Sequence, residues 1–384
     1  MAHRLKDLSV VGLLLGSALI SWYGIFNFDQ PLIAACACWA ITFCVLAYAN
    51  RHRYAIALLY LNLAAGCAAW LLADSYYWYR AAATRPNTTQ TITPRLMRTD
   101  TILGYEPIAN NAVRSVKATE DTLVYDVTYS IDPTGLRVSP DANAQPQGCI
   151  LFFGGSYTFG EGVEDWEAMP FQVGEKTAGA FQIYNFGISG HGPHQMLAAI
   201  EFGLVEDRVD CDVTHIVYQA IQEHIRRVSP GVSWGLWGPK YVIQDGEVVY
   251  IGRFSSTERL AELKRRLSNS ELYRRLRERN LTETNLATYF GVVEKSQKLL
   301  SEQYPNSQFH ILLWNHAQDT HRLMSEKFAA QQWQIHSSDA FLPQFAENRA
   351  AYQISPAVDN HPTGETHSII AEYVVTEILR FSLD

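Results

Sequence analysis

The sequence has few charges, no excess of basic residues and no internal repeat. Charged residues make up 18% of the 384 residues, and the formal net charge is −8. A protein that binds nucleic acid usually carries a basic stripe that neutralises phosphates, so the composition excludes this class. After the first seventy-four residues the composition is that of an ordinary globular domain, with enough length to bury one large core.

Charges are missing altogether from three long stretches near the N terminus. Residues 8–28, 30–50 and 54–73 contain no Asp, Glu, Lys or Arg, and only short polar breaks separate them. A helix needs roughly 20 apolar residues to cross a hydrocarbon core about 30 Å thick. The sequence therefore predicts a three-helix transmembrane anchor over residues 1–80, with the lipid bilayer as its partner.

Basic residues set the expected orientation of this anchor. Arg4 and Lys6 precede the first stretch, and Arg51 and Arg53 lie between the second and the third. With three spans these two sites share one side, which the positive-inside rule makes cytoplasmic. We therefore expect a multi-pass protein of the inner (cytoplasmic) membrane, with its catalytic domain periplasmic or otherwise extracytoplasmic.

Cysteine is scarce outside the apolar stretches. Of the six cysteines, only Cys149 and Cys211 fall in the rest of the chain. An even pair in an oxidising compartment is a candidate disulfide. In a flavodoxin-like sheet both residues would lie at the amino ends of neighbouring strands, which predicts a bond between them.

The chain after the anchor begins with a linker and a small β-rich segment at residues 81–140, and then alternates between strand and helix patterns. Buried-strand runs occur at residues 149–153, 181–185, 215–220 and 309–314. Such alternation implies right-handed βαβ crossovers and a parallel sheet covered on both faces. We therefore predict an α/β domain over residues 141–384, with a flavodoxin-like parallel sheet flanked by helices. A hairpin and an arginine-rich helical segment, expected to be a solvated face, are inserted at about residues 230–305.

A glycine-rich turn follows the first of these strands and presents a serine. Residues 151–162 read LFFGGSYTFGEG, so Gly154 and Gly155 stand immediately before Ser156. Ligands of open α/β sheets bind at the carboxyl ends of the strands. The glycines allow a sharp turn that leaves the Ser156 amide free to donate to an oxyanion. Ser156 is therefore the candidate nucleophile.

Two other active-site motifs are absent from this turn. The residue two after the serine is Thr158, where the nucleophile elbow of α/β-hydrolases has glycine. The segment also lacks the Gly-Lys-Ser/Thr ending of a phosphate-binding P-loop. His191 and His194 have no third ligand at a zinc spacing, so we expect neither a metal nor a cofactor.

A serine nucleophile needs a base to take its proton and an acid to orient that base. Asp359 and His361 stand together directly before the C-terminal helix predicted for residues 365–381. The adjacent acid, the loop position and the following helix single out His361 among twelve histidines. The sequence thus predicts a catalytic triad of Ser156, His361 and Asp359.

These segments resemble the sequence blocks of the SGNH/GDSL hydrolases. Residues 153–162 are similar to the first block, which carries the nucleophile, although Gly155 stands in place of the usual aspartate. Residues 185–190 (NFGISG) are similar to the second block, whose glycine amide contributes to the oxyanion hole together with the Ser156 amide, and this role falls on Gly190. Residues 359–362 (DNHP) are similar to the last block. The resemblance spans about residues 149–381 and implies a membrane-anchored, serine-dependent esterase or acyltransferase of bacterial type.

The third block of the family departs from its usual pattern in this chain. After the third strand the family has Gly-x-Asn-Asp, whose asparagine donates to the oxyanion, whereas residues 218–224 here read YQAIQEH. Gln222 or His224 could supply the missing donor. The loss of one such donor typically costs about 100- to 1000-fold in rate.

Three further residues are expected to line the substrate pocket. His191 follows the second strand, and Trp314 and His316 follow the fourth, so all three belong to the same edge of the predicted sheet.

The predicted chemistry is the removal or transfer of an acyl group, such as acetyl, on an extracytoplasmic cell-surface glycan. The aromatic residues and the expected location favour this substrate. A lipid esterase or lysophospholipase remains open, and so does an acyltransferase that works with a membrane acyl-donor protein. A third alternative is a non-catalytic scaffolding or binding module of a polysaccharide assembly system, which the altered third block favours.

Overall fold

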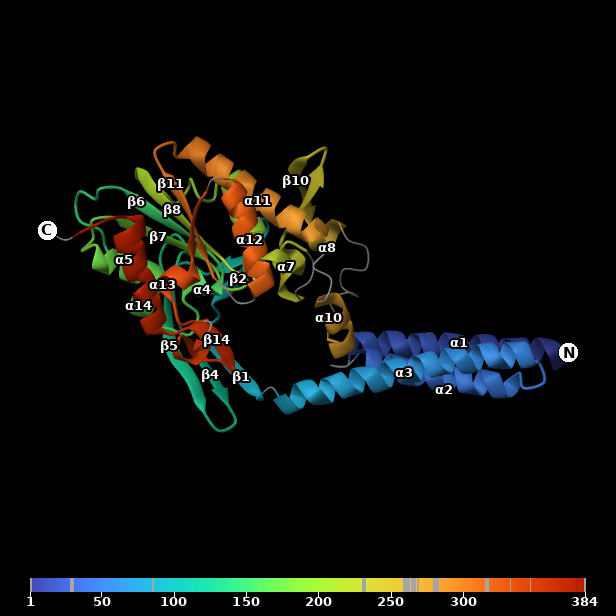
Figure 1. Ribbon diagram of the computed structural model, residues 1–384. Coiled ribbons are helices and arrows are strands. Elements are labelled where there is room, and N and C mark those ends of the chain that lie inside the picture. Colours follow the sequence, from blue (N-terminus) through green and yellow to red (C-terminus); the bar gives the residue numbers. More distant parts are fainter. Residues whose placement is uncertain are drawn as a thin grey trace. The chain divides into compact units, whose positions relative to one another are not determined.

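The computed structural model describes most of the chain, in two units. The described residues are 2–27, 31–84, 86–229, 233–257, 263, 267, 269–278, 283–314, 318–331, 333–345 and 347–382. By its internal contacts the chain divides into Met1–Arg85 with Arg259–Asn280, and Pro86–Glu258 with Leu281–Asp384. Figure 1 shows the elements of both units.

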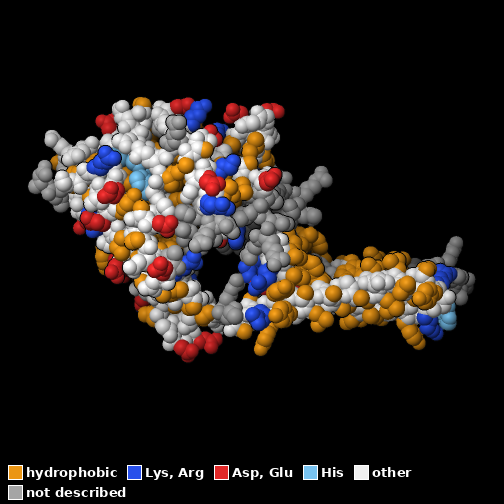
Figure 2. Space-filling model, in the orientation of Figure 1, with side chains coloured by type: hydrophobic (Ala, Val, Ile, Leu, Met, Phe, Trp, Pro, Cys, Tyr) orange, Lys and Arg blue, Asp and Glu red, His pale blue; other side chains and the backbone are white. Residues whose placement is uncertain are grey.

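The first unit is built on three helices, α1 (Ala2–Asn27), α2 (Pro31–Ala49) and α3 (Tyr54–Thr84). Two segments, Leu32–Ala49 and Tyr54–Ala81, are long and apolar enough to cross a membrane. Only 6% of the second segment is buried, which is unlike the core helix of a soluble domain. Figure 2 shows hydrophobic side chains along these helices on the face drawn. In α1 the apolar stretch of described side chains is shorter, Val10–Tyr23, so the three-span anchor stays a prediction.

Part of the arginine-rich segment packs on α3 within this unit. Asp74 of α3 is buried, and its Oδ1 accepts hydrogen bonds from Ser270 Oγ (3.0 Å) and Leu272 N (2.8 Å) at the start of α10 (Glu271–Glu278). The guanidinium of Arg275 lies 4.9 Å from the centre of the Tyr77 ring. Polar and cation–π contacts thus hold the start of α10 against α3. The Arg275 side chain is still 46% exposed, so the solvated face stays a prediction.

The second unit contains a parallel sheet of five strands in the order β12-β11-β8-β6-β7. Its strands are β6 (Cys149–Gly154), β7 (Gln182–Gly187), β8 (Val213–Ala220), β11 (Gln308–Leu313) and β12 (Gln334–Ser337). In chain order this is 2-1-3-4-5, the order of flavodoxin-like doubly wound sheets. The parallel sheet predicted from the sequence is confirmed. The edge strand β12 was not expected, because the residues QIHS are partly exposed and form no apolar run.

Helices cover both faces of this sheet (Figure 1). Strand β6 buries alternate side chains in two cores, with Leu151 and Phe153 in one and Ile150 and Phe152 in the other. The first core is closed by α6 (Pro193–Glu201), α11 (Glu283–Gln303) and α12 (Gln318–Ala330), and the second by α5 (Met169–Lys176) and α14 (Gly364–Tyr373). A strand that is buried on both faces must be apolar throughout, which explains its continuous hydrophobic run.

The remaining elements of this unit are small. A hairpin of β9 (Pro239–Gln244) and β10 (Glu247–Arg253) turns at Asp245 and Gly246, whose φ angles of 50° and 85° suit the tight turn expected from Asp-Gly. Other short elements described in this unit are the α-helices α4 (Ser156–Phe159), α7 (Glu223–Arg227), α8 (Phe254–Thr257) and α13 (Ser338–Phe341), the strands β13 (Gln353–Ser355) and β14 (Asp359–Pro362), the 3₁₀ turns η1 (Asp165–Glu167), η2 (Ser233–Trp237) and η3 (Arg349–Ala351), and the π-helical end η4 (Val374–Ile378).

An antiparallel β-rich segment precedes the parallel sheet within the same unit. Strands β1 (Thr88–Thr93), β4 (Asn111–Thr119) and β5 (Leu123–Ile131) form one sheet, and β2 (Met97–Asp100) pairs with β3 (Gly104–Pro107). Ser130 N of β5 donates to both carboxylate oxygens of Asp165 at 3.1 Å, in the loop after α4. This segment therefore contacts the region that follows Ser156.

The predicted disulfide between Cys149 and Cys211 is confirmed. Their Cα atoms lie 6.2 Å apart, within the usual range for disulfides, and the bond closes a sequence separation of 62 residues. It lies at the amino end of β6, whereas Ser156 follows the carboxyl end of the same strand.

Candidate active site

Ser156 is held at the carboxyl end of β6 by close backbone packing. It is the first residue of α4, so its amide has no carbonyl acceptor within that helix. A Cβ atom at Gly154 would lie 2.1 Å from Thr158 Oγ1, and one at Gly187 would lie 2.5 Å from Phe159 N. Only glycine at the ends of β6 and β7 lets α4 approach the sheet this closely.

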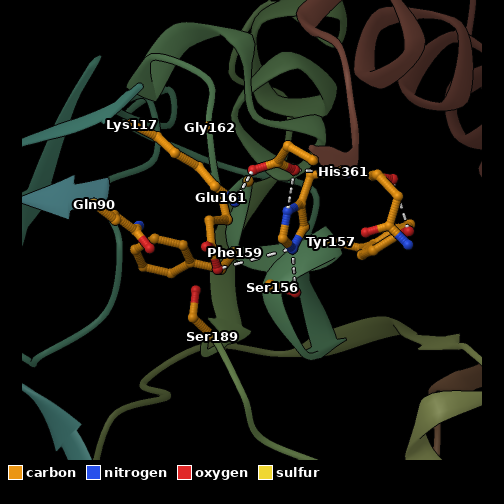
Figure 3. A network of polar contacts seen from close by, with 12 residues as sticks. Gln90, Lys117, Ser156, Tyr157, Phe159, Glu161, Gly162, Ser189 and His361 are labelled. Carbon is orange, nitrogen blue, oxygen red and sulfur yellow. Dashed lines mark hydrogen bonds and ion pairs between the residues drawn. The ribbon is translucent and has the colours of Figure 1, made fainter. Parts of the chain in front are cut away.

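His361 connects Ser156 to Asp359 (Figure 3). The distance from His361 Nε2 to Ser156 Oγ is 2.8 Å, and that from His361 Nδ1 to Asp359 Oδ1 is 2.6 Å. The same Oδ1 accepts from the His361 backbone amide at 2.9 Å, which fixes the imidazole relative to the carboxylate. All three residues predicted from the sequence thus meet. The arrangement can remove the proton of a serine hydroxyl and stabilise the resulting imidazolium.

Lys117 of β4 completes this chain of contacts, and no sequence pattern indicated it. Its Nζ donates to Asp359 Oδ2 at 2.8 Å, and the Asp359 side chain is fully buried. Burial by itself would raise the pKa of Asp359, but hydrogen bonds from His361 and Lys117 outweigh burial and lower it. Asp359 is therefore ionised in the folded protein, as an orienting acid must be.

A second carboxylate, Glu161, lies beside the imidazole. Its Oε2 is 3.8 Å from His361 Nε2, on the side of the ring that faces Ser156 (Figure 3). Burial lowers the pKa of His361, but the hydrogen bond to Asp359 and the charges of Glu161 and Asp359 raise it above the ordinary value. The charge of Lys117 acts in the opposite direction. The base is thus tuned by charges from three separate segments of the chain, which carry Lys117, Glu161 and Asp359.

Arg137 supports the loop that carries Glu161. It is fully buried and lies over the rings of Tyr129 and Phe159, with its guanidinium carbon 4.7 and 4.9 Å from the ring centres. It donates to Asp165 at 3.0 Å and to three backbone carbonyls, those of residues 159, 160 and 163. The loop after Ser156 is therefore fixed by a cation from outside the strand–turn–helix motif.

A cleft of about 680 Å³ opens over this site. Ser156, Glu161 and His361 line it, together with Gly190 and Arg227. The β-rich segment contributes a mixed wall of Gln90, Ile92, Leu96, Met97, Tyr105 and Tyr129. The remaining lining residues are Tyr157, Ser189, Ile221, Gln222, Glu223 and Asn360.

The oxyanion candidates separate into two groups. Gly190, with a φ of 83°, lines the cleft near Ser156, and so does Gln222. His224 is fully buried, and its Nδ1 lies 2.8 Å from the phenolic oxygen of Tyr218. Burial lowers the pKa of His224 well below the ordinary value, so the ring is neutral. His224 is not among the described lining residues, which leaves Gln222 as the better placed of the two predicted donors.

Two of the expected pocket residues are placed elsewhere, and the third lies outside the described residues. His191 is 5% exposed, and its Nε2 lies 3.0 Å from the Tyr105 carbonyl oxygen. It lines a separate cavity of about 30 Å³, because its ring turns toward β3. Trp314 is 1% exposed and packs against Tyr157 and Phe345, so it supports the cleft from below instead of lining it. His316 is not described.

Comparisons with known proteins give no family for this chain. No family model and no curated protein matches it. One solved crystal structure aligns with 63% of this chain and 100% of its own, at 13% identity and a TM-score of 0.35. A likeness at that score says nothing about fold or function. Any functional proposal for this protein therefore depends on the geometry of the site.

Proposed function

We propose that this protein is an SGNH-type serine esterase or acyltransferase that acts on an ester of an extracytoplasmic glycan. The observation that carries the proposal is the relay of Ser156, His361 and Asp359 at the carboxyl end of a parallel strand, within one open cleft. Hydrogen-bonded serine, imidazole and carboxylate groups of this kind serve acyl transfer on several unrelated folds.

The reaction follows from the contacts. His361 Nε2 takes the proton of Ser156, whose Oγ attacks the carbonyl carbon of the ester while the Ser156 and Gly190 amides donate to the oxyanion. The bond to the leaving oxygen then breaks, and His361 returns the proton to that oxygen. Water, or a hydroxyl of a second sugar, next gives its proton to His361 and attacks the acyl-serine. The bond between the acyl carbon and Ser156 Oγ then breaks, and His361 returns the proton to that oxygen, which restores the serine. Hydrolysis yields the free acid, and transfer yields a new ester.

The lining of the cleft favours a neutral glycan. Its volume of about 680 Å³ is in the range of small-molecule sites, and tyrosine rings and amide groups suit sugar faces and hydroxyls. Two carboxylates, Glu161 and Glu223, face a single arginine, Arg227, which disfavours a polyanion. Carboxylate, amide and guanidinium groups interrupt the apolar part of the lining, whereas a long acyl chain needs a continuous apolar channel.

Location outside the cytoplasm is part of the proposal. The apolar helices of the first unit support attachment to a membrane, and the Cys149–Cys211 disulfide is typical of oxidising compartments. With three spans, the basic residues at 4, 6, 51 and 53 favour an N terminus inside and a site outside.

The test is hydrolysis of p-nitrophenyl acetate and of longer p-nitrophenyl esters by the full chain in detergent. Ser156→Ala should lower kcat by about 10⁴-fold or more, because it removes the attacking atom. Labelling of Ser156 by a fluorophosphonate gives a second readout. A Ser156→Ala variant that keeps most of the wild-type turnover would refute the assignment.

A further inference from the structure

Arg227 is a buried cation beside the nucleophile, and the acyl-transfer steps of Ser156 and His361 do not use it. It is the last residue of α7, is 8% exposed and lines the cleft that holds Ser156. Its Nη1 donates a hydrogen bond to the carbonyl oxygen of His191. Within the described part of the chain no carboxylate forms an ion pair with it, and Glu223 and Glu161 attract it only through space.

A purely structural role explains this residue poorly. A guanidinium has five N–H donors, and the bond to His191 uses one nitrogen. Burying a charge without an ionic partner is costly, and an apolar side chain of similar volume would fill the space at lower cost. The cleft is therefore the place where the other donors of Arg227 can find partners, in water or in a bound substrate.

The Arg227 guanidinium lies next to the chain neighbours of both expected oxyanion donors, the amides of Ser156 and Gly190. A Cβ atom at Gly155 would lie 2.7 Å from Arg227 Nη1 and 3.1 Å from His191 O. Gly155 directly precedes Ser156, and His191 directly follows Gly190. Nη1 therefore contacts the neighbour of each amide donor, and it fills the space that an aspartate side chain at position 155 would need.

We propose that Arg227 is a catalytic residue that donates to the oxyanion of acyl transfer, where SGNH enzymes use the asparagine of their third block. The inference rests on the proposed function. It joins two departures from the family pattern, since glycine at position 155 admits the guanidinium, and the guanidinium replaces the donor missing from residues 218–224.

The chemistry needs no further reactant. As Ser156 Oγ bonds to the ester carbon, the carbonyl electron pair moves to oxygen, and an N–H of Arg227 donates to that oxygen. When the bond to the leaving oxygen breaks, the electron pair returns to the carbonyl. Arg227 stays protonated throughout, so its contribution is greatest when the oxyanion exists.

The experiment measures kcat and KM for p-nitrophenyl acetate with the full chain. Arg227→Met should lower kcat by about 100- to 1000-fold while KM changes little, because the lost donor acts mainly on the oxyanion. The affinity for a trifluoromethyl ketone, which forms an anionic adduct on serine, should fall in parallel. Arg227→Lys keeps the charge and should give an intermediate loss. Arg226→Met, on the same helix, is the matched control and should stay within about threefold of wild type.

A second variant tests the proposal independently if Arg227→Met does not fold. Gly155→Ala adds a Cβ that would lie 2.7 Å from Arg227 Nη1, so the guanidinium must shift while its charge is retained, and kcat should also fall. Folding is checked by circular dichroism. Wild-type kcat in a folded Arg227→Met variant would overturn the proposal, and if that variant does not fold, wild-type kcat in folded Gly155→Ala would do so. A large loss of kcat in Gln222→Ala with none in Arg227→Met would also overturn it. If the wild type hydrolyses no ester and no fluorophosphonate labels Ser156, the proposed function falls and this inference falls with it. An active wild type with an unaffected Arg227→Met overturns the inference alone.

Discussion

Replacing Arg137 by methionine should destabilise the second unit and disorder the loop after Ser156. The guanidinium is fully buried and donates to Asp165 and to three backbone carbonyls. Methionine fills much of the volume but donates nothing, so these acceptors lose their partner. Removing one member of a buried ion pair typically costs about 3–5 kcal/mol.

The lower part of that range applies here. Asp165 is 13% exposed and keeps its hydrogen bonds from Ser130 N, so it is not left wholly without a donor. We therefore expect a loss of about 3–4 kcal/mol in the free energy of unfolding. At about 2–4 °C per kcal/mol for a domain of 150–250 residues, the Tm should fall by about 6–16 °C.

Arg114 provides the matched control for this experiment. It also pairs with an aspartate, Asp126, from the same antiparallel sheet, but its side chain is 67% exposed. Exposed pairs contribute about 0–1 kcal/mol, so Arg114→Met should barely change the Tm. Both variants are measured by thermal unfolding in the same detergent, followed by circular dichroism. If Arg137→Met unfolds at the same temperature as Arg114→Met, the assigned role of Arg137 is wrong.

Charge, covalent linkage and topology give three further predictions. The kcat/KM for ester hydrolysis should fall as the pH drops through the pKa of His361, because only the neutral imidazole accepts a proton. Lys117→Met should move this fall to higher pH, and Glu161→Gln should move it to lower pH. Unchanged pH profiles in both variants would contradict the assigned effects of these charges on His361. Reduction of the disulfide should lower the free energy of unfolding by about 4 kcal/mol, because the bond closes a loop of 62 residues. Equal urea midpoints with and without reductant would argue against a stabilising bond. Alkaline phosphatase fused to the C terminus should be active, and a fluorescent protein that folds only in the cytoplasm should stay dark at the same position. The reverse result would mean that the number of spans is even.

Much of the site could be predicted from the sequence because its signals are local. The two glycines before Ser156, the acid two residues before His361 and the apolar run of β6 can each be recognised within a few neighbouring residues. Strand–helix alternation then brings the carboxyl ends of the strands to one edge, so the meeting of Ser156 with His361 could be expected. The disulfide could be expected from the same topology, since neighbouring strands place Cys149 near Cys211.

The tertiary structure alone decided which side chains tune that site. Lys117 reaches Asp359 across 242 positions of sequence, and Arg137 reaches the loop after Ser156 from outside the motif. Such contacts leave no periodic or spacing signal, because they depend on how the antiparallel segment packs on the parallel sheet. Trp314 lies at the expected edge of the sheet but does not line the pocket, for the same reason. The strand sets the position of the residue, whereas packing against Tyr157 and Phe345 sets the direction of its side chain.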